Sequence, residues 1–224
     1  IKDTTDVSCY GYSDGSATVI VNPSGAYTGT GPISWSWNGS PPQINDSTAT
    51  GLTAGVYEVT ITDSLNCQTG AVITINQPDS ITISISKTDV SCFGDGDGAA
   101  AATVTGGTSP FTFFWTPGNF TTDSIGGLNP GLYNVSITDA NGCTASVTDT
   151  IIQPAALAAT FSKNDITCYG FNNGTATVIT SDGTPPYTYL WSDGQTNNTA
   201  ASLSPGIVYV TVTDKNGCTI DDSI

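Results

Sequence analysis

Three residue types are missing from the 224-residue sequence, which contains no arginine, no histidine and no methionine. The four basic residues are all lysine, against 19 acidic residues, so the formal net charge is −15. A chain of this charge repels phosphate backbones and anionic membrane surfaces, which excludes nucleic acid as a partner and argues against a membrane surface. A strongly acidic surface favours solubility, cation binding and a location outside the cell.

Long apolar runs are also missing, because no stretch approaches the roughly 20 apolar residues of a membrane span. We therefore expect no membrane insertion. No signal peptide opens the chain, which we expect of a mature internal fragment. There is no histidine for a Ser-His-Asp set, and no acidic pair stands in an unrepeated setting that suggests a cleft. The sequence therefore does not predict an enzyme.

What the chain does contain is one series of motifs repeated three times. The segments "DVSCYGYSDGSATVIV", "DVSCFGDGDGAAAATV" and "DITCYGFNNGTATVIT" begin at Asp6, Asp89 and Asp165. A tryptophan-bearing segment follows each of them, and then a segment that ends in a second cysteine. The period of roughly 75–85 residues suits a small independent domain.

Proline-containing connections after Pro78 and Pro154 predict three domains, 1–78, 79–154 and 155–224, joined semi-rigidly. The first repeat lacks most of the leading strand found in the others, and the third stops while its final strand is still running. We therefore expect a monomeric piece of a longer array.

Each repeat is predicted to be a β-sandwich. Apolar residues alternate at period two, as at Tyr57, Val59 and Ile61, and turn residues interrupt the strands every eight to twelve residues or so. The segment "GLxxGxY" is similar to the tyrosine corner of immunoglobulin-like sandwiches at Tyr57 and Tyr133, whereas Val208 takes that position in the third repeat. The predicted fold class is all-β, a tandem array of three immunoglobulin-like β-sandwich domains.

Each repeat holds two cysteines at equivalent places, one before an early strand and one after a late strand. We expect both to lie near one pole of the sandwich and to form one disulfide within each domain, namely Cys9–Cys67, Cys92–Cys143 and Cys168–Cys218. Closing a loop of about 50 residues would stabilise each domain by roughly 4 kcal/mol in the chain-entropy model. Buried free thiols are the alternative, while two thiolates without histidine leave a zinc site half built. Disulfides imply an oxidising compartment.

The acidic residues beside the cysteines are candidate calcium ligands. They lie close to the first cysteine or four residues before the second: Asp89, Asp95, Asp97, Asp139, Asp6, Asp14, Asp63, Asp165 and Asp214. Carboxylates and glycine-turn carbonyls are the oxygen ligands that calcium prefers, and no other cofactor is expected. The alternative is a set of tight turns capped by aspartate. No EF-hand is present, because Gly106 stands where position 12 from Asp95 needs glutamate.

The combination C-[YF]-G, then P-x-x-x-x-W, then G-x-Y-x-V-x-[IV]-T-D-x-x-x-C resembles the SprB repeat, a family named for a surface adhesin of gliding Bacteroidota. The first repeat departs by the insertion "NPSGAYTGTG" and the third by its shifted tyrosine. The resemblance implies a filament exported by the type IX system and associated with the outer membrane. It also implies that the parent adhesin contacts an extracellular surface or polysaccharide in attachment or gliding.

The resemblance gives meaning to Asp-Ser/Thr followed by an aliphatic residue or threonine, which is an O-glycan acceptor sequence in that phylum, although such triplets also arise by chance. They occur at Thr4, Ser47, Ser64, Ser80, Ser124, Thr150 and Ser223.

The leading functional hypothesis is a disulfide-stapled stalk that displays an adhesive region and transmits force. A carbohydrate-binding module is the alternative. Its candidate stacking residues are Trp35, Tyr10, Phe93, Tyr169 and Tyr209.

Overall fold

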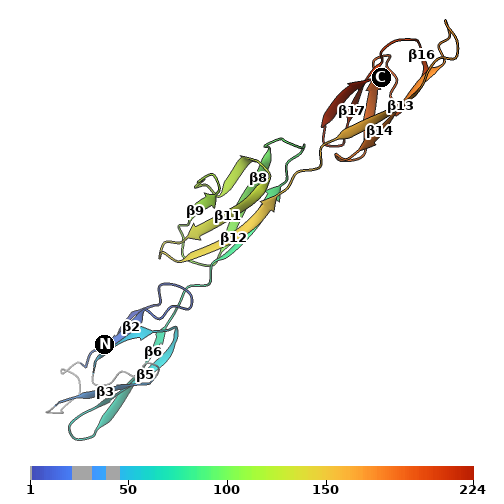
Figure 1. The fold of residues 1–224 in the computed structure, drawn as a ribbon. Coiled ribbons are helices and arrows are strands. Elements are labelled where there is room, and N and C mark those ends of the chain that lie inside the picture. Colours follow the sequence, from blue (N-terminus) through green and yellow to red (C-terminus); the bar gives the residue numbers. More distant parts are fainter. Residues whose placement is uncertain (1, 22–31, 39–45) are drawn as a thin grey trace. The chain divides into compact units, whose positions relative to one another are not determined.

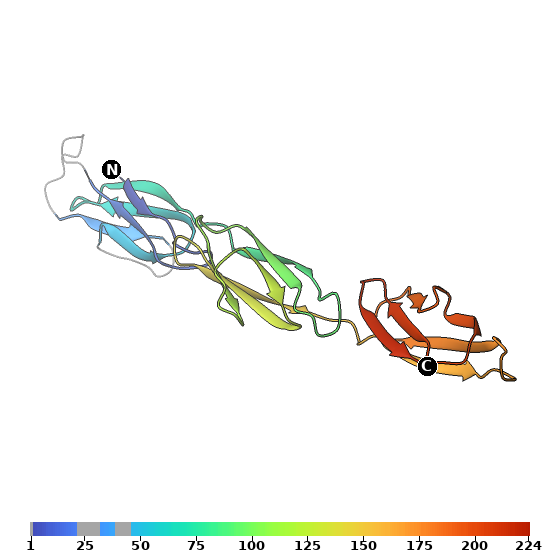
Figure 2. The same ribbon diagram turned by 90° about the horizontal axis from the view of Figure 1, so that it is seen from above.

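The computed structural model describes residues 2–21, 32–38 and 46–224, and the insertion at 22–31 lies outside the described residues. Every regular element of the described part is a β-strand, as two views of the ribbon show (Figures 1 and 2). The all-β prediction is therefore confirmed. No helix among the described residues has the length and apolar character needed to cross a membrane.

The strands of the described residues form six three-stranded sheets, two for each sequence repeat. The chain divides into two compact units, which we describe separately. The first comprises 1–84, 103–114 and 135–147, and the second comprises 85–102, 115–134 and 148–224. The second repeat contributes to both units, and the division into three domains at Pro78 and Pro154 stays a prediction.

The first unit contains the six strands of the first repeat. They are β1 (Lys2–Thr5), β2 (Gly15–Val19), β3 (Ser34–Trp37), β4 (Thr48–Leu52), β5 (Gly55–Thr62) and β6 (Gln68–Ile75). The sheets have the orders β1-β2-β4 and β3-β5-β6, and all pairs are antiparallel. This division matches strands A, B and E against C, F and G of an immunoglobulin-type sandwich. Buried side chains of both sheets form one core, in which Trp37, Leu52 and Val59 are at most 4% exposed.

The second unit contains the six strands of the third repeat. They are β13 (Ala158–Asn164), β14 (Gly174–Ser181), β15 (Thr188–Trp191), β16 (Thr199–Leu203), β17 (Tyr209–Thr213) and β18 (Thr219–Ser223). Their sheets, β13-β14-β16 and β15-β17-β18, repeat the order of the first repeat. Trp191, Val178 and Val210 lie in the core between them.

The second repeat has the same strand order. Its strands are β7 (Thr82–Thr88), β8 (Gly98–Thr105), β9 (Thr112–Thr116), β10 (Ser124–Leu128), β11 (Gly131–Thr138) and β12 (Thr144–Ile151). They form the sheets β10-β8-β7 and β12-β11-β9. The predicted alternation is confirmed, because Tyr133, Val135 and Ile137 are buried while the residues between them are more exposed.

The tyrosine corner is also confirmed in two repeats. The Tyr57 hydroxyl donates to the Thr53 carbonyl at 2.9 Å, and the Tyr133 hydroxyl donates to the Asn129 carbonyl at 3.0 Å. In the third repeat Val208 packs against the core instead, and Tyr209 is 60% exposed.

Candidate functional site

The two disulfides of the described residues join consecutive repeats. Cys9 of the first repeat bonds Cys143 of the second within the first unit, and Cys92 of the second bonds Cys218 of the third within the second unit. The Cα atoms are 5.6 Å apart in both. Cys67 and Cys168 are free and exposed. The prediction of one bridge within each domain, Cys9–Cys67, Cys92–Cys143 and Cys168–Cys218, is therefore wrong.

The first repeat shows why its own two cysteines do not meet. Cys67 stands just before β6, whereas the loop of Cys9 contacts Gln77, beyond the far end of β6. Eight strand residues span about 26 Å, and a disulfide needs Cα atoms within roughly 7 Å. The two cysteines of this repeat therefore lie at opposite poles, not at one pole as the sequence analysis expected.

We call the segment around the first cysteine the early loop, residues 8–14 in the first repeat. Ser8 N–H donates to Asp14 Oδ1 at 3.0 Å, and the Ser8 hydroxyl donates to Asp14 Oδ2. These donors lower the pKa of Asp14 below its usual 3.8. Gly11 adopts φ +77°, a conformation that favours glycine, and its N–H donates to Gln77 Oε1 at 2.9 Å. These hydrogen bonds thus hold the early loop in its conformation in addition to the disulfide.

We call the segment around the second cysteine the late loop, residues 139–143 in the second repeat. Asp139 is 5% exposed, and burial raises its pKa. The N–H groups of Thr108, Cys143 and Asn141 outweigh that effect, so the pKa of Asp139 is lowered. These N–H groups donate to its carboxylate at 2.9–3.0 Å. This aspartate, singled out as a calcium candidate, therefore shapes the loop that presents Cys143.

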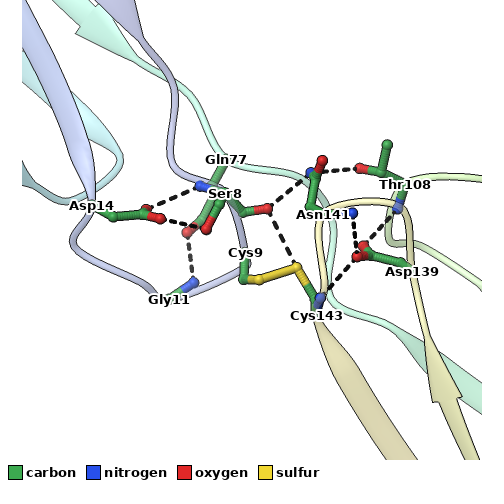
Figure 3. Close-up of a disulfide and its surroundings, with 9 residues drawn as sticks. All are labelled: Ser8, Cys9, Gly11, Asp14, Gln77, Thr108, Asp139, Asn141 and Cys143. Carbon is green, nitrogen blue, oxygen red and sulfur yellow. Dashed lines mark hydrogen bonds between the residues drawn. A yellow bond between two sulfur atoms is a disulfide. The ribbon is translucent and has the colours of Figure 1, made fainter.

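One asparagine adds a polar contact to the disulfide (Figure 3). Asn141 Nδ2 donates to the Ser8 carbonyl at 3.0 Å and to Thr108 Oγ1 at 3.2 Å. Cys143 Sγ lies 3.3 Å from the same Ser8 carbonyl, and since a disulfide sulfur carries no proton this is a close contact. The late loop of one repeat thereby contacts the backbone of the early loop of the repeat before it.

The second disulfide repeats this arrangement group by group. Asp214 accepts N–H bonds from Thr184, Asn216 and Cys218 at 2.8–3.0 Å. Asn216 Nδ2 donates to the Ser91 carbonyl at 2.9 Å. Ser91 in turn donates to Asp97 through its N–H and its hydroxyl, which lowers the pKa of Asp97. Because the same contacts occur in both units, the inter-repeat link is a property of the repeat.

A groove lies beside each disulfide and contains an aromatic residue of the early loop. The first, of about 140 Å³, is lined by Tyr10 together with Ile81 and Asp139. The second, of about 430 Å³, is lined by Phe93 together with Leu157 and Ile220. Tyr10 and Phe93 are each 58% exposed. Both residues, considered above as sugar-stacking candidates, therefore lie at inter-repeat contacts.

The structure does not assemble the predicted calcium shell within the first repeat. Asp6 accepts the Asn76 N–H beyond β6, whereas Asp63 accepts the Cys67 N–H before β6. In the second repeat Asp89 accepts the N–H of Ile152, which lowers its pKa together with the hydrogen bond and charge of Lys87. No group of three or more histidine, cysteine or acidic residues that could hold a metal occurs in the described ranges. Calcium binding stays a prediction.

The remaining candidates are distributed over the surface. Trp35 packs against the core of the first repeat, while Tyr169 and Tyr209 are exposed. The predicted glycan acceptors are exposed or half-buried, and their modification stays a prediction. They are Thr4, Ser47, Ser64, Ser80, Ser124, Thr150 and Ser223.

Sequence reasoning missed Asn141 and Asn216 as linking residues. A signal was present, because asparagine stands two residues before the second cysteine in the second and third repeats, where the first repeat has Leu65.

The profile of the SprB repeat family matches residues 84–120 and 160–196. These matches lie in the second and third repeats, and membership of the first stays a prediction. The match supports a surface adhesin-like repeat region. A search of curated proteins found no match.

Several solved structures align with low similarity. Drosophila OTK extracellular domains 3–5 are 12% identical, with 87% of this chain and 84% of that chain covered and a TM-score of 0.33. The N-terminal eight Ig domains of Down Syndrome Cell Adhesion Molecule are 11% identical, with 85% and 31% covered and a TM-score of 0.29. Salmonella alpha-2-macroglobulin is 9% identical, with 99% and 22% covered and a TM-score of 0.22. At these TM-scores the alignments carry no argument about function.

Proposed function

We propose that this chain is part of a cell-surface adhesin in which the repeats form a force-bearing stalk, and the match of residues 84–120 and 160–196 to the SprB repeat family supports this proposal. The observation that carries the proposal is the pair of disulfides between consecutive repeats. A disulfide within a domain protects that domain alone. A disulfide between neighbours instead provides a second covalent route along the array.

The pairing limits how far a pulled chain extends. The shortest covalent path runs from the amino terminus to Cys9, across to Cys143, back to Cys92 and across to Cys218. It contains about 65 residues, or roughly 23 nm at about 3.5 Å per residue, against roughly 78 nm for the open chain. The disulfides thus limit how far the stalk lengthens when individual strands open.

Single-molecule pulling from both termini tests this role. We expect the oxidised chain to reach no more than roughly 23 nm of contour, and the reduced chain to approach roughly 78 nm. The variant Cys9→Ser/Cys92→Ser should behave like the reduced chain without reductant. Equal lengths for oxidised and reduced chains would contradict a load-bearing disulfide path.

The same family match supports the finer elements of the proposal. We propose export through the type IX system, association with the outer membrane, and an adhesive contact made by another part of the parent protein during attachment or gliding. The role is structural and not enzymatic. The acidic composition and the disulfides support a location outside the cell.

One groove favours carbohydrate binding as a second candidate. It measures about 510 Å³ in the third repeat and is lined by Tyr209, Asp221 and Asp222, an aromatic ring beside carboxylates. A ring of this kind can stack on a sugar while the carboxylates accept hydroxyl donors. A glycan array decides between the candidates, because the stalk proposal expects no binding by these repeats. A hit that is lost in Tyr209→Ala would instead favour the carbohydrate module.

A further inference from the structure

The two disulfides differ in their exposure to solvent. We call Cys9–Cys143 the first link and Cys92–Cys218 the second link. Cys9 and Cys143 are 5% and 8% exposed, whereas Cys92 and Cys218 are both half-buried. The aspartate and asparagine contacts are the same at both links, so the difference arises from the other residues that surround each disulfide.

The grooves beside the two disulfides differ in the same direction. The groove measures about 140 Å³ at the first link and about 430 Å³ at the second. Pockets that hold small molecules in proteins measure about 300–1,000 Å³. The groove of the second link therefore has the volume to take a small molecule against its disulfide, and the groove of the first link does not.

Two differences in sequence account for the wider groove. Tyr12 lines the groove of the first link, and the equivalent residue at the second link is the shorter Asp95. All four residues of the connection 78–81 line the first groove, whereas the connection contributes residues 156–157 to the second. Fewer side chains thus cover the second disulfide.

The walls of the wider groove indicate the kind of molecule that fits it. Phe93, Leu157 and Ile220 contribute apolar surface. Among the described residues that line this groove, Asp95 is the only one with a charge. A carboxylate attracts an ammonium group and repels a second anion. The disulfide itself reacts with thiolates. A small thiol that also carries an ammonium group, an amino thiol, matches these three features.

We propose that the second link is a thiol-exchange site that takes small amino thiols and opens while the first link stays closed. The reactive group is the Cys92–Cys218 disulfide, and Asp95 holds the ammonium group of the amino thiol beside it. Once the link is open, the connection after Pro154 alone joins the second and third repeats covalently. This inference concerns the chemistry of the link and does not rest on the stalk role.

The exchange takes place in two balanced steps. The thiolate of one amino thiol attacks a sulfur of the disulfide, the S–S bond breaks, and a mixed disulfide forms while the other cysteine leaves as a thiolate. A second amino thiol then attacks the mixed disulfide and releases the first cysteine. The protein disulfide gains two electrons and two protons, and two amino thiols are oxidised to one small disulfide.

Reduction of the oxidised chain by cysteamine, an amino thiol, tests the order of opening. Cys67 and Cys168 are first blocked with N-ethylmaleimide, so that these thiols take no part. After timed exposure to cysteamine in EDTA, the new thiols are labelled with iodoacetamide. Asp-N digestion then places each of the six cysteines in a separate peptide. We expect the second link to open about tenfold faster than the first, at a rate proportional to the cysteamine concentration, because attack requires access to a sulfur.

The variant Asp95→Asn tests the preference for an ammonium group. Thioglycolate carries a carboxylate where cysteamine carries its ammonium group. Each thiol is compared with itself on the two proteins, so that differences in intrinsic reactivity between the thiols cancel. We expect Asp95→Asn to raise the rate of thioglycolate at the second link by about fivefold, as the loss of one nearby unit charge would give in water, and not to raise the rate of cysteamine.

The variant Tyr12→Ala tests whether the narrow groove protects the first link. Removal of this ring opens the first groove and leaves the second groove as it is. We expect cysteamine to open the first link several-fold faster in this variant, with no change at the second link. Tyr209→Ala removes an exposed ring that lines neither groove, and this control should change neither rate.

Four outcomes would overturn the inference. Equal rates at the two links, or faster opening of the first, would mean that the groove does not govern exchange. A rate at the second link that is independent of the thiol concentration would mean that unfolding of the second unit opens it. An equal rise for both thiols in Asp95→Asn would contradict the ammonium preference. An unchanged first link in Tyr12→Ala would contradict its protection by the narrow groove.

Discussion

At the scale of single residues, the aspartates next to the cysteines act as hydrogen-bond acceptors that shape loops. Asp139 is the clearest example, because it is buried and still accepts three backbone N–H bonds. Its folded-state pKa lies below 3.8, so its contribution to stability is fully present above pH 3.8. That contribution is lost as the pH falls through the lower folded value.

We therefore expect Asp139→Asn to lower the melting temperature at pH 7, where the carboxylate is ionised in the folded and unfolded chain. The difference in melting temperature between this variant and the unaltered protein should shrink as the pH falls below 3.8. The Asp139 carboxyl of the unaltered protein then becomes protonated and loses its charge. Thermal melts from pH 7 to pH 2.5 measure this difference in melting temperature. Asp3→Asn, at an exposed position of β1, is the control. It should change neither the melting temperature at pH 7 nor its dependence on pH. A deficit that is independent of pH would assign the loss to packing and not to charge.

At the scale of elements, glycine marks the start of the second strand of each sandwich. A Cβ atom on Gly98 would lie 2.8 Å from Ile151 Cγ2 and 2.9 Å from the Leu128 carbonyl oxygen. Gly15 meets Ile75 and Leu52 in the same way. The glycine repeated at this place is thus required by the close approach of two strands.

We expect Gly98→Ala to destabilise the second unit by about 1–3 kcal/mol through overpacking. Gly126→Ala is the matched control, because it lies in the paired strand β10 and a Cβ there meets nothing within 4 Å. Urea unfolding of both variants gives the two free energies. Equal changes in the free energy of unfolding would mean that the restricted backbone of alanine, and not steric contact of its Cβ atom, governs the effect at Gly98.

The early loop is the element to which the calcium prediction belongs. The second repeat offers Asp89, Asp95 and Asp97, but both Asp97 oxygens already accept bonds from Ser91. If this loop binds calcium, a melt in calcium lies above a melt in EDTA, with disulfides intact and magnesium without effect, because an ion bound only by the folded state stabilises it. Asp95→Asn should reduce the rise. Superimposable melts would leave these residues as turn caps only.

Strands and cores were predictable from the sequence because the period-two alternation is local. Tyr57, Val59 and Ile61 are buried as that pattern requires. The disulfide partners were not predictable in this way, since equivalent cysteines bond just as well to a neighbour as to their own repeat. What decides is the length of β6, which separates Cys67 from the early loop of Cys9. The linking role of Asn141 was also not predictable, because its acceptor is the Ser8 carbonyl of another repeat.

At the scale of the whole molecule, the two disulfides form overlapping covalent loops of 134 and 126 residues. Each connection between repeats is enclosed by one of them: Pro78 lies between Cys9 and Cys143, and Pro154 lies between Cys92 and Cys218. A break of the backbone at either connection therefore leaves the array in one piece. Disulfides within repeats would not have this effect.

This difference is measurable by cutting the chain. With a specific protease site inserted between Pro78 and Asp79, we expect cleavage to leave a single species on a non-reducing gel and to give two fragments after reduction. Cys9→Ser should release the fragments without reductant. A site between Pro154 and Ala155 should behave likewise, with Cys92→Ser as its control. If the chain with all six cysteines releases its fragments without reductant, no disulfide joins consecutive repeats. The force-bearing path proposed here is then absent. If they stay joined, an array of such repeats withstands a proteolytic cut at the connections between its repeats.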